Sequence, residues 1–428
     1  MKVKYLIFKC LILIILISML PSCNQKNDVQ SNKLSLYLLN NGDRTDIVAA
    51  INDFNSVSKV KVEIKNFSTG QAEEYCNILA TELMSGIGPD IVLIEAGEFK
   101  SVYKAISTNV FYDINEQIKN DTSFKLDDYN KKVLNSGVFS GKRYLMPIGY
   151  NLNVFSEDKE NKKDKDISFD ASDWTWNYLG EICSDYIKKN KNNYVFFSGA
   201  ERLFTDMLMN DIDIFVDNKN KTCNFKSAMF IELLNTYKNQ IYQSFIPEDE
   251  VLSDPKFFER IVFIDESMAT RTKWYSSEVN YKKNYYLMPT INGEKSVYIN
   301  PCYSIGIASK CENKNEAYEF IKLMLSEKIQ DKVRCMPVNY NSYFKNANFF
   351  IKNIGNGSVN VDSEEKQIDK ELIKSQYNEI QEIGKCMFID YSVMDIINLE
   401  LANFLKSKIS AEETAARIDE KVKLCLNE

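Results

Sequence analysis

Residues 82–94 read Glu82-Leu83-Met84-Ser85-Gly86-Ile87-Gly88-Pro89-Asp90-Ile91-Val92-Leu93-Ile94. The apolar spacing over residues 76–84 predicts an amphipathic helix. Gly86, Gly88 and Pro89 then stop that helix, because glycine weakens a helix and proline cannot donate a backbone hydrogen bond. The apolar run over residues 90–94 predicts a buried strand directly afterwards. Such close alternation of helix and strand is typical of α/β folds.

The residues on the N-terminal side continue this alternation. Residues 34–39 form an apolar run that predicts another buried strand, and Asn40-Asn41-Gly42-Asp43 is a turn signal. Helical apolar spacing follows over residues 47–54, and alternating apolar residues over 59–67 predict a further strand. Alternating strands and helices predict a largely parallel sheet, which binds ligands at the carboxyl ends of its strands. Here those ends are residues 40–44 and 95–98.

A second α/β region begins after residue 148. We expect a charged, solvated insertion at residues 159–166 and a mobile loop at 355–365. The other predicted elements are helices at 173–189, 227–237, 316–325 and 411–426, and strands at 194–197, 285–288 and 303–308.

The composition limits the chemistry that this chain of 428 residues can perform. It contains no histidine, which excludes Ser-His-Asp and Cys-His catalysis and histidine-ligated zinc sites. Its net charge of −7 argues against nucleic-acid binding, which normally needs a basic surface. Hydrophobic residues make up 44% and charged residues 26%, so the chain as a whole is expected to fold.

The N-terminus has the pattern of an export signal. Three lysines precede an apolar run over residues 11–20 that is too short to span a bilayer. The following Leu20-Pro21-Ser22-Cys23 resembles the bacterial lipobox, in which the cysteine is diacylated and becomes the new N-terminus. We therefore expect a signal peptide at 1–22, a lipid on Cys23 and a lipid-anchored tether over 23–33. The alternative is an uncleaved anchor or an export signal without a lipid.

Eight of the ten cysteines remain when Cys10 and Cys23 are set aside. An even number outside the cell permits disulfides, but a core of this size does not need them, so we expect buried free thiols. If a bridge exists, Cys302 and Cys311 form the pair to test first. None of the eight lies in a CxxC pair, so neither a metal nor a cofactor is expected.

The order of these segments resembles that of the extracellular solute-binding proteins of ABC importers, the family that includes maltose-binding protein. The matching motifs are the helix-to-strand segment 82–91, Asn41-Gly42-Asp43-Arg44, the crossing segment 141–151, Asp173-Trp174-Thr175-Trp176, residues 313–330, Met336-Pro337-Val338-Asn339 and Ser410-Ala411-Glu412-Glu413-Thr414-Ala415. One motif departs from the family pattern, because the usual Gly-Lys-Ala-Ala-Met is here Asp265-Glu266-Ser267-Met268-Ala269.

The resemblance implies an α/β protein with the two-lobed periplasmic-binding-protein type II fold. The first lobe would comprise residues 34–147 and 301–343, and the second residues 148–300 and 344–428. A ligand in the cleft touches both lobes only when the hinge closes, so it favours the closed form. The protein would be a lipid-anchored, extracytoplasmic monomer that captures a carbohydrate and delivers it to an ABC permease, without enzymatic activity.

A carbohydrate site needs aromatic rings for the sugar faces and charged or polar groups for the hydroxyls. Trp274 is the best aromatic candidate, because the family places a cleft-facing tryptophan near this position, although core packing is the alternative. Trp176 is expected to pack in the core, and for Trp174 both readings stay open. The further aromatic candidates are Tyr150, Tyr303 and Tyr391.

The polar candidates come in three pairs. Asp43 and Arg44 match residues that hold sugar hydroxyls in the family, with a solvated turn as the alternative. Glu95 and Glu98 follow the strand at 90–94, at the same edge of the sheet. The third pair, Glu201 with Arg202, lies in a predicted loop and would act from the second lobe.

Two other functions fit the sequence. The same fold could bind a peptide or another solute, or act as the sensor for a membrane kinase. A lipid-anchored glycoside hydrolase needs only two carboxylates, but no spacing singles out such a pair.

Overall fold

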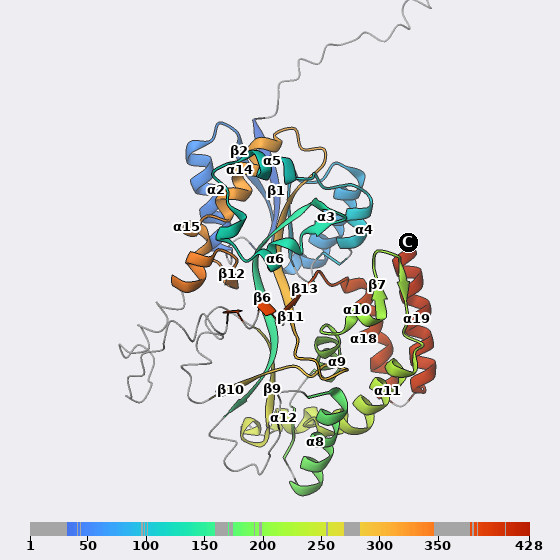
Figure 1. The fold of residues 1–428 in the computed structure, drawn as a ribbon. Helices are drawn as coiled ribbons and strands as arrows, with labels where there is room; N and C mark the ends of the chain where they lie inside the picture. Colours follow the sequence, from blue (N-terminus) through green and yellow to red (C-terminus); the bar gives the residue numbers. More distant parts are fainter. Residues whose placement is uncertain are drawn as a thin grey trace, which may run out of the picture.

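The computed structural model describes residues 32–428, except for residues 41, 43, 96, 98, 101, 159–169, 171–173, 192, 197–198, 254–255, 269–282, 346–376, 379–380, 383 and 407. The predicted signal peptide, Cys23, most of the tether, the insertion at 159–166 and the loop at 355–365 lie outside the described residues. Two bodies lie one above the other, and the long strands β6 (Leu145–Asp158) and β11 (Val297–Ile307) pass between them (Figure 1).

One mixed sheet runs through both bodies. Its order is β10-β6-β11-β3-β1-β2, with β9 and β12 also paired to β6 and β13 to β11. The remaining bounds are β1 (Lys33–Leu39), β2 (Lys61–Phe67), β3 (Ile91–Glu95), β9 (Phe263–Met268), β10 (Lys283–Leu287), β12 (Met336–Pro337) and β13 (Gly384–Cys386).

Parallel pairing is found at the first end of the sheet and between β11 and β13. β1 is parallel to both β2 and β3. In contrast, β11 is antiparallel to β3 and to β6, and β9, β10 and β12 are antiparallel to β6. The prediction of a parallel sheet is therefore confirmed for β1, β2 and β3, from whose sequence it was drawn, but the sheet as a whole is mixed. Local alternation of strands and helices does not reveal that two strands cross between the bodies in opposite directions.

Helices cover both faces of the upper part of this sheet. Successive residues of a strand point to opposite faces. Leu36 and Leu38 accordingly join the core under α2 (Thr45–Val57), α14 (Lys314–Met324) and α15 (Glu327–Gln330), whereas Leu39 joins the core under α3 (Ala72–Ser85) and α4 (Val102–Ser107). The helix end predicted from residues 82–94 is confirmed: Gly86 is the left-handed C-cap of α3, with φ of 73°.

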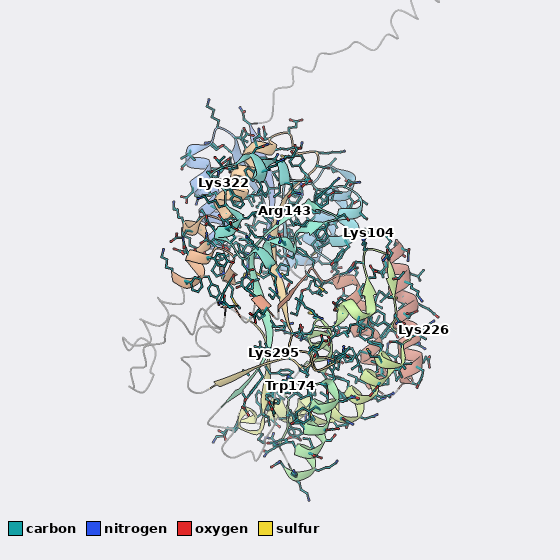
Figure 2. The ribbon with its side chains drawn as sticks, in the orientation of Figure 1. Lys104, Arg143, Trp174, Lys226, Lys295 and Lys322 are labelled. Atoms are coloured by element: carbon teal, nitrogen blue, oxygen red, sulfur yellow. A yellow bond between two sulfur atoms is a disulfide. The ribbon has the colours of Figure 1, made fainter. Side chains whose placement is uncertain are left out.

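The lower body has its own core. It is formed by α8 (Trp176–Lys189), α9 (Ala200–Leu208), α11 (Ala228–Thr236), α18 (Tyr391–Leu405) and α19 (Ala411–Asn427). Trp176 is buried, which confirms that it packs in the core. Trp174 is buried there too (Figure 2), and its indole N–H donates to the Leu287 carbonyl at 3.0 Å.

Short elements complete the described chain. The strands are β4 (Val138–Phe139), β5 (Lys142–Arg143), β7 (Val216–Asp217) and β8 (Thr222–Cys223), and the helices are α5 (Asn115–Asn120), α6 (Lys131–Asn135), α10 (Ile212–Phe215) and α12 (Glu248–Ser253). Single turns lie at Thr69–Gln71, Leu126–Asp128, Tyr237–Ile241, Tyr242–Ser244 and Phe257–Arg260.

Two predictions about local structure need correction. The loop predicted around residues 198–202 contains the start of α9. The strand predicted at 194–197 is reduced to isolated bridges at Tyr194 and Phe196. In both places, contacts between distant segments override the local pattern.

The expectation of free thiols is confirmed for six of the eight cysteines, but it was wrong for two of them. Cys302 forms a disulfide with Cys335, not with Cys311. Six other cysteines in the described part of the chain are thiols, and Cys311 is buried among them. The bridge joins β11 to the segment before β12, a pairing that depends on the sheet order and not on sequence spacing.

Candidate functional site

The carboxyl ends of β1 and β3 bring two predicted site residues together. Arg44 lies between β1 and α2, and Glu95 is the last residue of β3. Their side chains form an ion pair that is largely buried, with 17% of the Arg44 and 10% of the Glu95 side chain exposed. The expectation that polar residues gather at this sheet edge therefore holds for this pair, while Asp43 and Glu98 lie outside the described residues.

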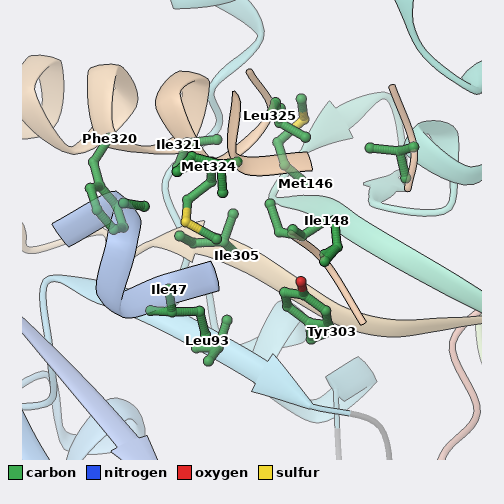
Figure 3. Packing of buried hydrophobic residues seen from close by; sticks show 14 of the residues in the cluster. Ile47, Leu93, Met146, Ile148, Tyr303, Ile305, Phe320, Ile321, Met324 and Leu325 are labelled. Carbon is green, nitrogen blue, oxygen red and sulfur yellow. The ribbon is translucent and has the colours of Figure 1, made fainter. Parts of the chain in front are cut away.

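Tyr303 lies directly beside this ion pair. It is opposite Glu95 in the pairing of β11 with β3, and the Arg44 guanidinium carbon lies 5.4 Å from the centre of its ring. The Tyr303 hydroxyl donates a hydrogen bond to the buried carboxylate of Asp46, in the first turn of α2. Figure 3 shows the Tyr303 ring with Ile47, Leu93 and other side chains of the first core.

The electrostatics of Tyr303 follow from this burial. Burial raises the pKa of Tyr303 well above its ordinary value, and the charge and hydrogen bond of Asp46 raise it further. The positive charges of Arg44 and Arg334 oppose part of that rise in pKa. Tyr303 is therefore a neutral hydroxyl at physiological pH, and its proton stays on the bond to Asp46.

One oxygen of the buried Glu95 carboxylate lacks a hydrogen-bond partner within the described part of the chain. Arg44 pairs with Oε2, whereas Oε1 is buried and has no hydrogen-bond partner among the described residues. A buried carboxylate oxygen without a donor is costly, so a ligand hydroxyl or amine that reached it would gain a strong, charge-assisted hydrogen bond.

Tyr391 of the second lobe lies close to the loop that follows Glu95. It is the first residue of α18, where the Asp390 side chain caps the helix. A side-chain carbon placed on Gly97, just beyond Glu95, would lie 4.0 Å from the Tyr391 ring. The Tyr391 backbone N–H donates to the Lys100 carbonyl at 3.1 Å. The structure thus brings Tyr391 against the loop that follows β3.

Glu201 and Arg202 are in the first turn of α9. The Arg202 side chain is 60% exposed, and its Nε donates to Oδ2 of Asp206 at 3.1 Å. Burial raises the pKa of Tyr391, and the negative charge of Asp206 adds to that rise. Arg202 and Asp206 thus form a pair within α9.

One aromatic candidate, Tyr150, is not part of this assembly. Tyr150 has no exposed surface and lies in the core of the first lobe, so its ring has no surface to offer a ligand. Trp274 lies outside the described residues.

Sequence analysis missed three polar residues of the site. Asp46 accepts a hydrogen bond from the Tyr303 hydroxyl, Asp206 pairs with Arg202, and Asn300 donates to the Tyr391 hydroxyl at 3.5 Å. Only Asp46 carried a local signal, because acidic side chains favour the first turn of a helix. The other two are recognisable only from the crossing of β11 and the helical start of α9.

Comparison with known proteins identifies the family. The protein-family model described as bacterial extracellular solute-binding protein matches residues 49–343 of this sequence. The chain belongs to this family. Its members are binding proteins that act outside the cytoplasm, and the resemblance found in the sequence is confirmed. No curated protein matches the sequence.

Solved structures share the fold. The sugar-binding protein MalE from Xanthomonas citri is 14% identical, with a TM-score of 0.67 over 92% of this chain and 97% of that one. The substrate-binding protein Lmo0181 from Listeria monocytogenes, in complex with cycloalternan, is 14% identical, with a TM-score of 0.63 and coverage of 92% and 99%.

The GacH receptor of Streptomyces glaucescens, solved without ligand and with acarbose, is 15% identical, with a TM-score of 0.62 and coverage of 92% and 98%. This protein therefore has the α/β, two-lobed fold of periplasmic binding proteins. Within the described residues, no helix has both the length and the apolar character needed to cross a membrane.

Proposed function

We propose that this protein captures a carbohydrate by closing its two lobes and delivers it to an ABC transporter permease. The observation that carries the proposal is that Arg44, Glu95 and Tyr303 of the first lobe lie together at the end of β3, while Tyr391 of the second lobe lies beside Gly97 in the loop that follows β3. A ligand held there would contact both lobes at once.

The chemistry of these side chains suits a sugar. Glu95 Oε1 accepts from a hydroxyl that donates, and the Arg44 guanidinium donates to a hydroxyl oxygen. Tyr391 offers an aromatic face, and we propose that Trp274 adds a second one. The proposed site also includes Asp43, Glu98, Glu201 and Arg202. Two structural neighbours were solved in complex with cycloalternan and with acarbose, which supports this class of ligand.

Closure of the lobes would couple ligand binding to recognition of the protein by the permease. The moving bodies are proposed to be residues 34–147 with 301–343, and residues 148–300 with 344–428. Separate apolar cores of the upper and lower bodies support two lobes, but Tyr150, Leu152 and Ile299, which this division assigns to the second lobe, pack in the upper core. A micromolar ligand provides about 8 kcal/mol, part of which drives closure. A permease could then distinguish the closed form from the open one.

Attachment to the membrane is proposed to come from the lipid on Cys23. An acidic protein is not attracted to an anionic membrane surface, so the lipid and the tether over residues 23–33 would hold it there as a monomer. Cys23→Ser should release the protein into the soluble fraction. Continued partition into membranes would contradict this part of the proposal.

A thermal-shift screen tests the ligand class. The panel contains maltotriose, acarbose, cycloalternan, D-tagatose and a mixture of short peptides. We expect at least one carbohydrate to raise the melting temperature and the peptides to leave it unchanged. A shift with the peptides alone would favour the peptide-binding alternative.

New reducing ends after incubation with the oligosaccharides would instead favour the glycoside hydrolase. Arg44→Ala should abolish a carbohydrate shift, whereas Lys33→Ala, which breaks the exposed ion pair with Glu63 at the far end of β1, should preserve it.

A further inference from the structure

β11 is irregular where it passes between the lobes. Asn300 pairs with Asn151 and Tyr303 pairs with Gly149, so Pro301 and Cys302 together face a single residue of β6. A second register shift follows between Tyr303 and Ser304. Bulged residues lack regular ladder partners, and proline has no N–H to donate. The pairing of β11 with β6 is therefore irregular on both sides of Tyr303, whereas the pairing of Tyr303 with Glu95 of β3 is regular and is where that regular ladder begins.

The disulfide between Cys302 and Cys335 lies at this irregular point. Cys335 immediately precedes β12, which pairs with Tyr150 and Gly149 on the other side of β6. The bridge thus passes over β6 at Gly149. A side-chain carbon on Gly149 would lie 2.9 Å from the sulfur of Cys335 and 3.5 Å from that of Cys302, so glycine leaves the room that the bridge needs.

The next residue after Cys302 is the centre of the candidate site. The Tyr303 hydroxyl donates a hydrogen bond to Asp46, and the Arg44 guanidinium lies near the Tyr303 ring. In the pairing of β11 with β3, Tyr303 is opposite Glu95. A slip of one residue in β11 would turn the Tyr303 side chain to the other face of the sheet. The group that holds Arg44 and Glu95 would then be lost, together with the packing of neighbouring β11 residues such as Ile305 in the upper core.

We propose that the Cys302–Cys335 disulfide is a positioning element of the ligand site: it fixes the bulge of β11 and so holds Tyr303 beneath Arg44 and Glu95. This inference rests on the proposed function, because it assigns these residues to ligand binding. The extracytoplasmic location of the family is compatible with a lasting disulfide.

The alternative is a bridge that only stabilises the chain. A disulfide that closes a separation of 33 residues restricts the unfolded state wherever it lies. The test must therefore separate the position of Tyr303 from overall stability. Cys311→Ser is the matched control, because it replaces a buried thiol of the first lobe that lies outside the site.

The experiment compares the protein with the double variant Cys302→Ser/Cys335→Ser and with Cys311→Ser. Peptide mass spectrometry without reductant first establishes the bridge in the unmodified protein. Calorimetry then measures Kd for maltotriose, acarbose and D-tagatose well below each melting temperature. Amide hydrogen exchange of residues 299–305 is followed without any ligand.

We expect the double variant to bind at least tenfold more weakly and to exchange faster at residues 299–305 than elsewhere in the first lobe. Cys311→Ser should keep its affinity even if its melting temperature falls. A double variant with a lower melting temperature, unchanged Kd and unchanged local exchange would overturn the inference, as would cysteines 302 and 335 found as thiols.

The exchange measurement distinguishes this inference from the proposed function. If none of the three sugars binds the unmodified protein, the carbohydrate proposal fails, and faster exchange confined to 299–305 still supports the positioning role. Uniform or unchanged exchange overturns it. If the double variant does not fold, Gly149→Ala keeps both cysteines but crowds the bridge; faster exchange at 299–305 supports the inference, and unchanged exchange overturns it.

Discussion

The two halves of the candidate site are built in different ways. In the first lobe, Arg44 and Glu95 are largely buried and lie against Tyr303. In the second lobe, the Arg202 side chain is 60% exposed, and its partner Asp206 belongs to the same helix. Buried, mutually bonded groups keep their geometry without a ligand, whereas exposed side chains lose freedom when they bind one. The first lobe therefore offers a preformed half of the site, and the second lobe completes it.

Of the substitutions considered, removal of the Arg44 side chain should disturb the first half of the site most. Arg44→Ala leaves the buried charge of Glu95 without its partner, which should cost about 3–5 kcal/mol of unfolding free energy. Affinity for the carbohydrate found in the screen should fall by about a hundredfold or more. Urea unfolding and calorimetry measure the two effects. Equal stability of Arg44→Ala and the exposed-pair control Lys33→Ala would contradict the contrast between buried and exposed pairs.

Asp211 makes the second lobe sensitive to pH. Burial raises the pKa of Asp211 to about 6, compared with about 3.9 for an unfolded aspartate. Between these values the folded state binds the proton and the unfolded state does not, so stability falls as pH rises from about 4 to about 6. Asp211→Asn removes this titration.

The stability of Asp211→Asn relative to the unmodified protein should therefore increase by about 2–3 kcal/mol between pH 4 and pH 7. Asparagine keeps an oxygen that can accept the Ile291 N–H, which Asp211 accepts at 2.9 Å. Urea unfolding over this pH range measures the change. A constant difference between the two proteins would show that Asp211 titrates normally.

Tyr303→Phe tests the bond that joins the first half to α2. It leaves the buried Asp46 carboxylate without the Tyr303 hydroxyl, and we expect a loss of about 1–3 kcal/mol in stability together with weaker ligand binding. Tyr37→Phe is the matched control, because it removes a tyrosine–carboxylate bond to Glu82 away from the site. If both variants bind equally well, Tyr303 has no positioning role.

Tyr391→Ala tests the contribution of the second lobe and should have the smallest effect. Loss of a stacked ring costs about 0.5–1.5 kcal/mol, which corresponds to a Kd increase of about two- to tenfold. Tyr391→Phe keeps the ring and should bind nearly normally. Calorimetry compares the two variants. A larger loss of ligand affinity for Tyr391→Phe than for Arg44→Ala would contradict the proposal that the first lobe contributes more to binding than the second.

The sequence predicted those parts of the fold that depend on neighbouring residues. The strand at 90–94, the glycine that ends α3 and the position of Arg44 and Glu95 after their strands all follow from local patterns. The bond from Tyr303 to Asp46 joins residues 257 positions apart, so no local pattern predicts it. The partner of Cys302 likewise depends on which strands flank β6. Both the hydrogen bond and the disulfide depend on contacts between segments that are distant in the sequence.

The crossing strand β6 has a consequence for how the molecule unfolds. Its Val154 packs in the upper core and the adjacent Phe155 packs in the lower one. The halves cannot be separated at a loop, because the cut would have to break the hydrogen bonds between paired strands. Each separated half would then expose unpaired backbone N–H and C=O groups, which promote aggregation. Separate expression of the halves should therefore yield aggregates, while the intact chain melts as one cooperative unit.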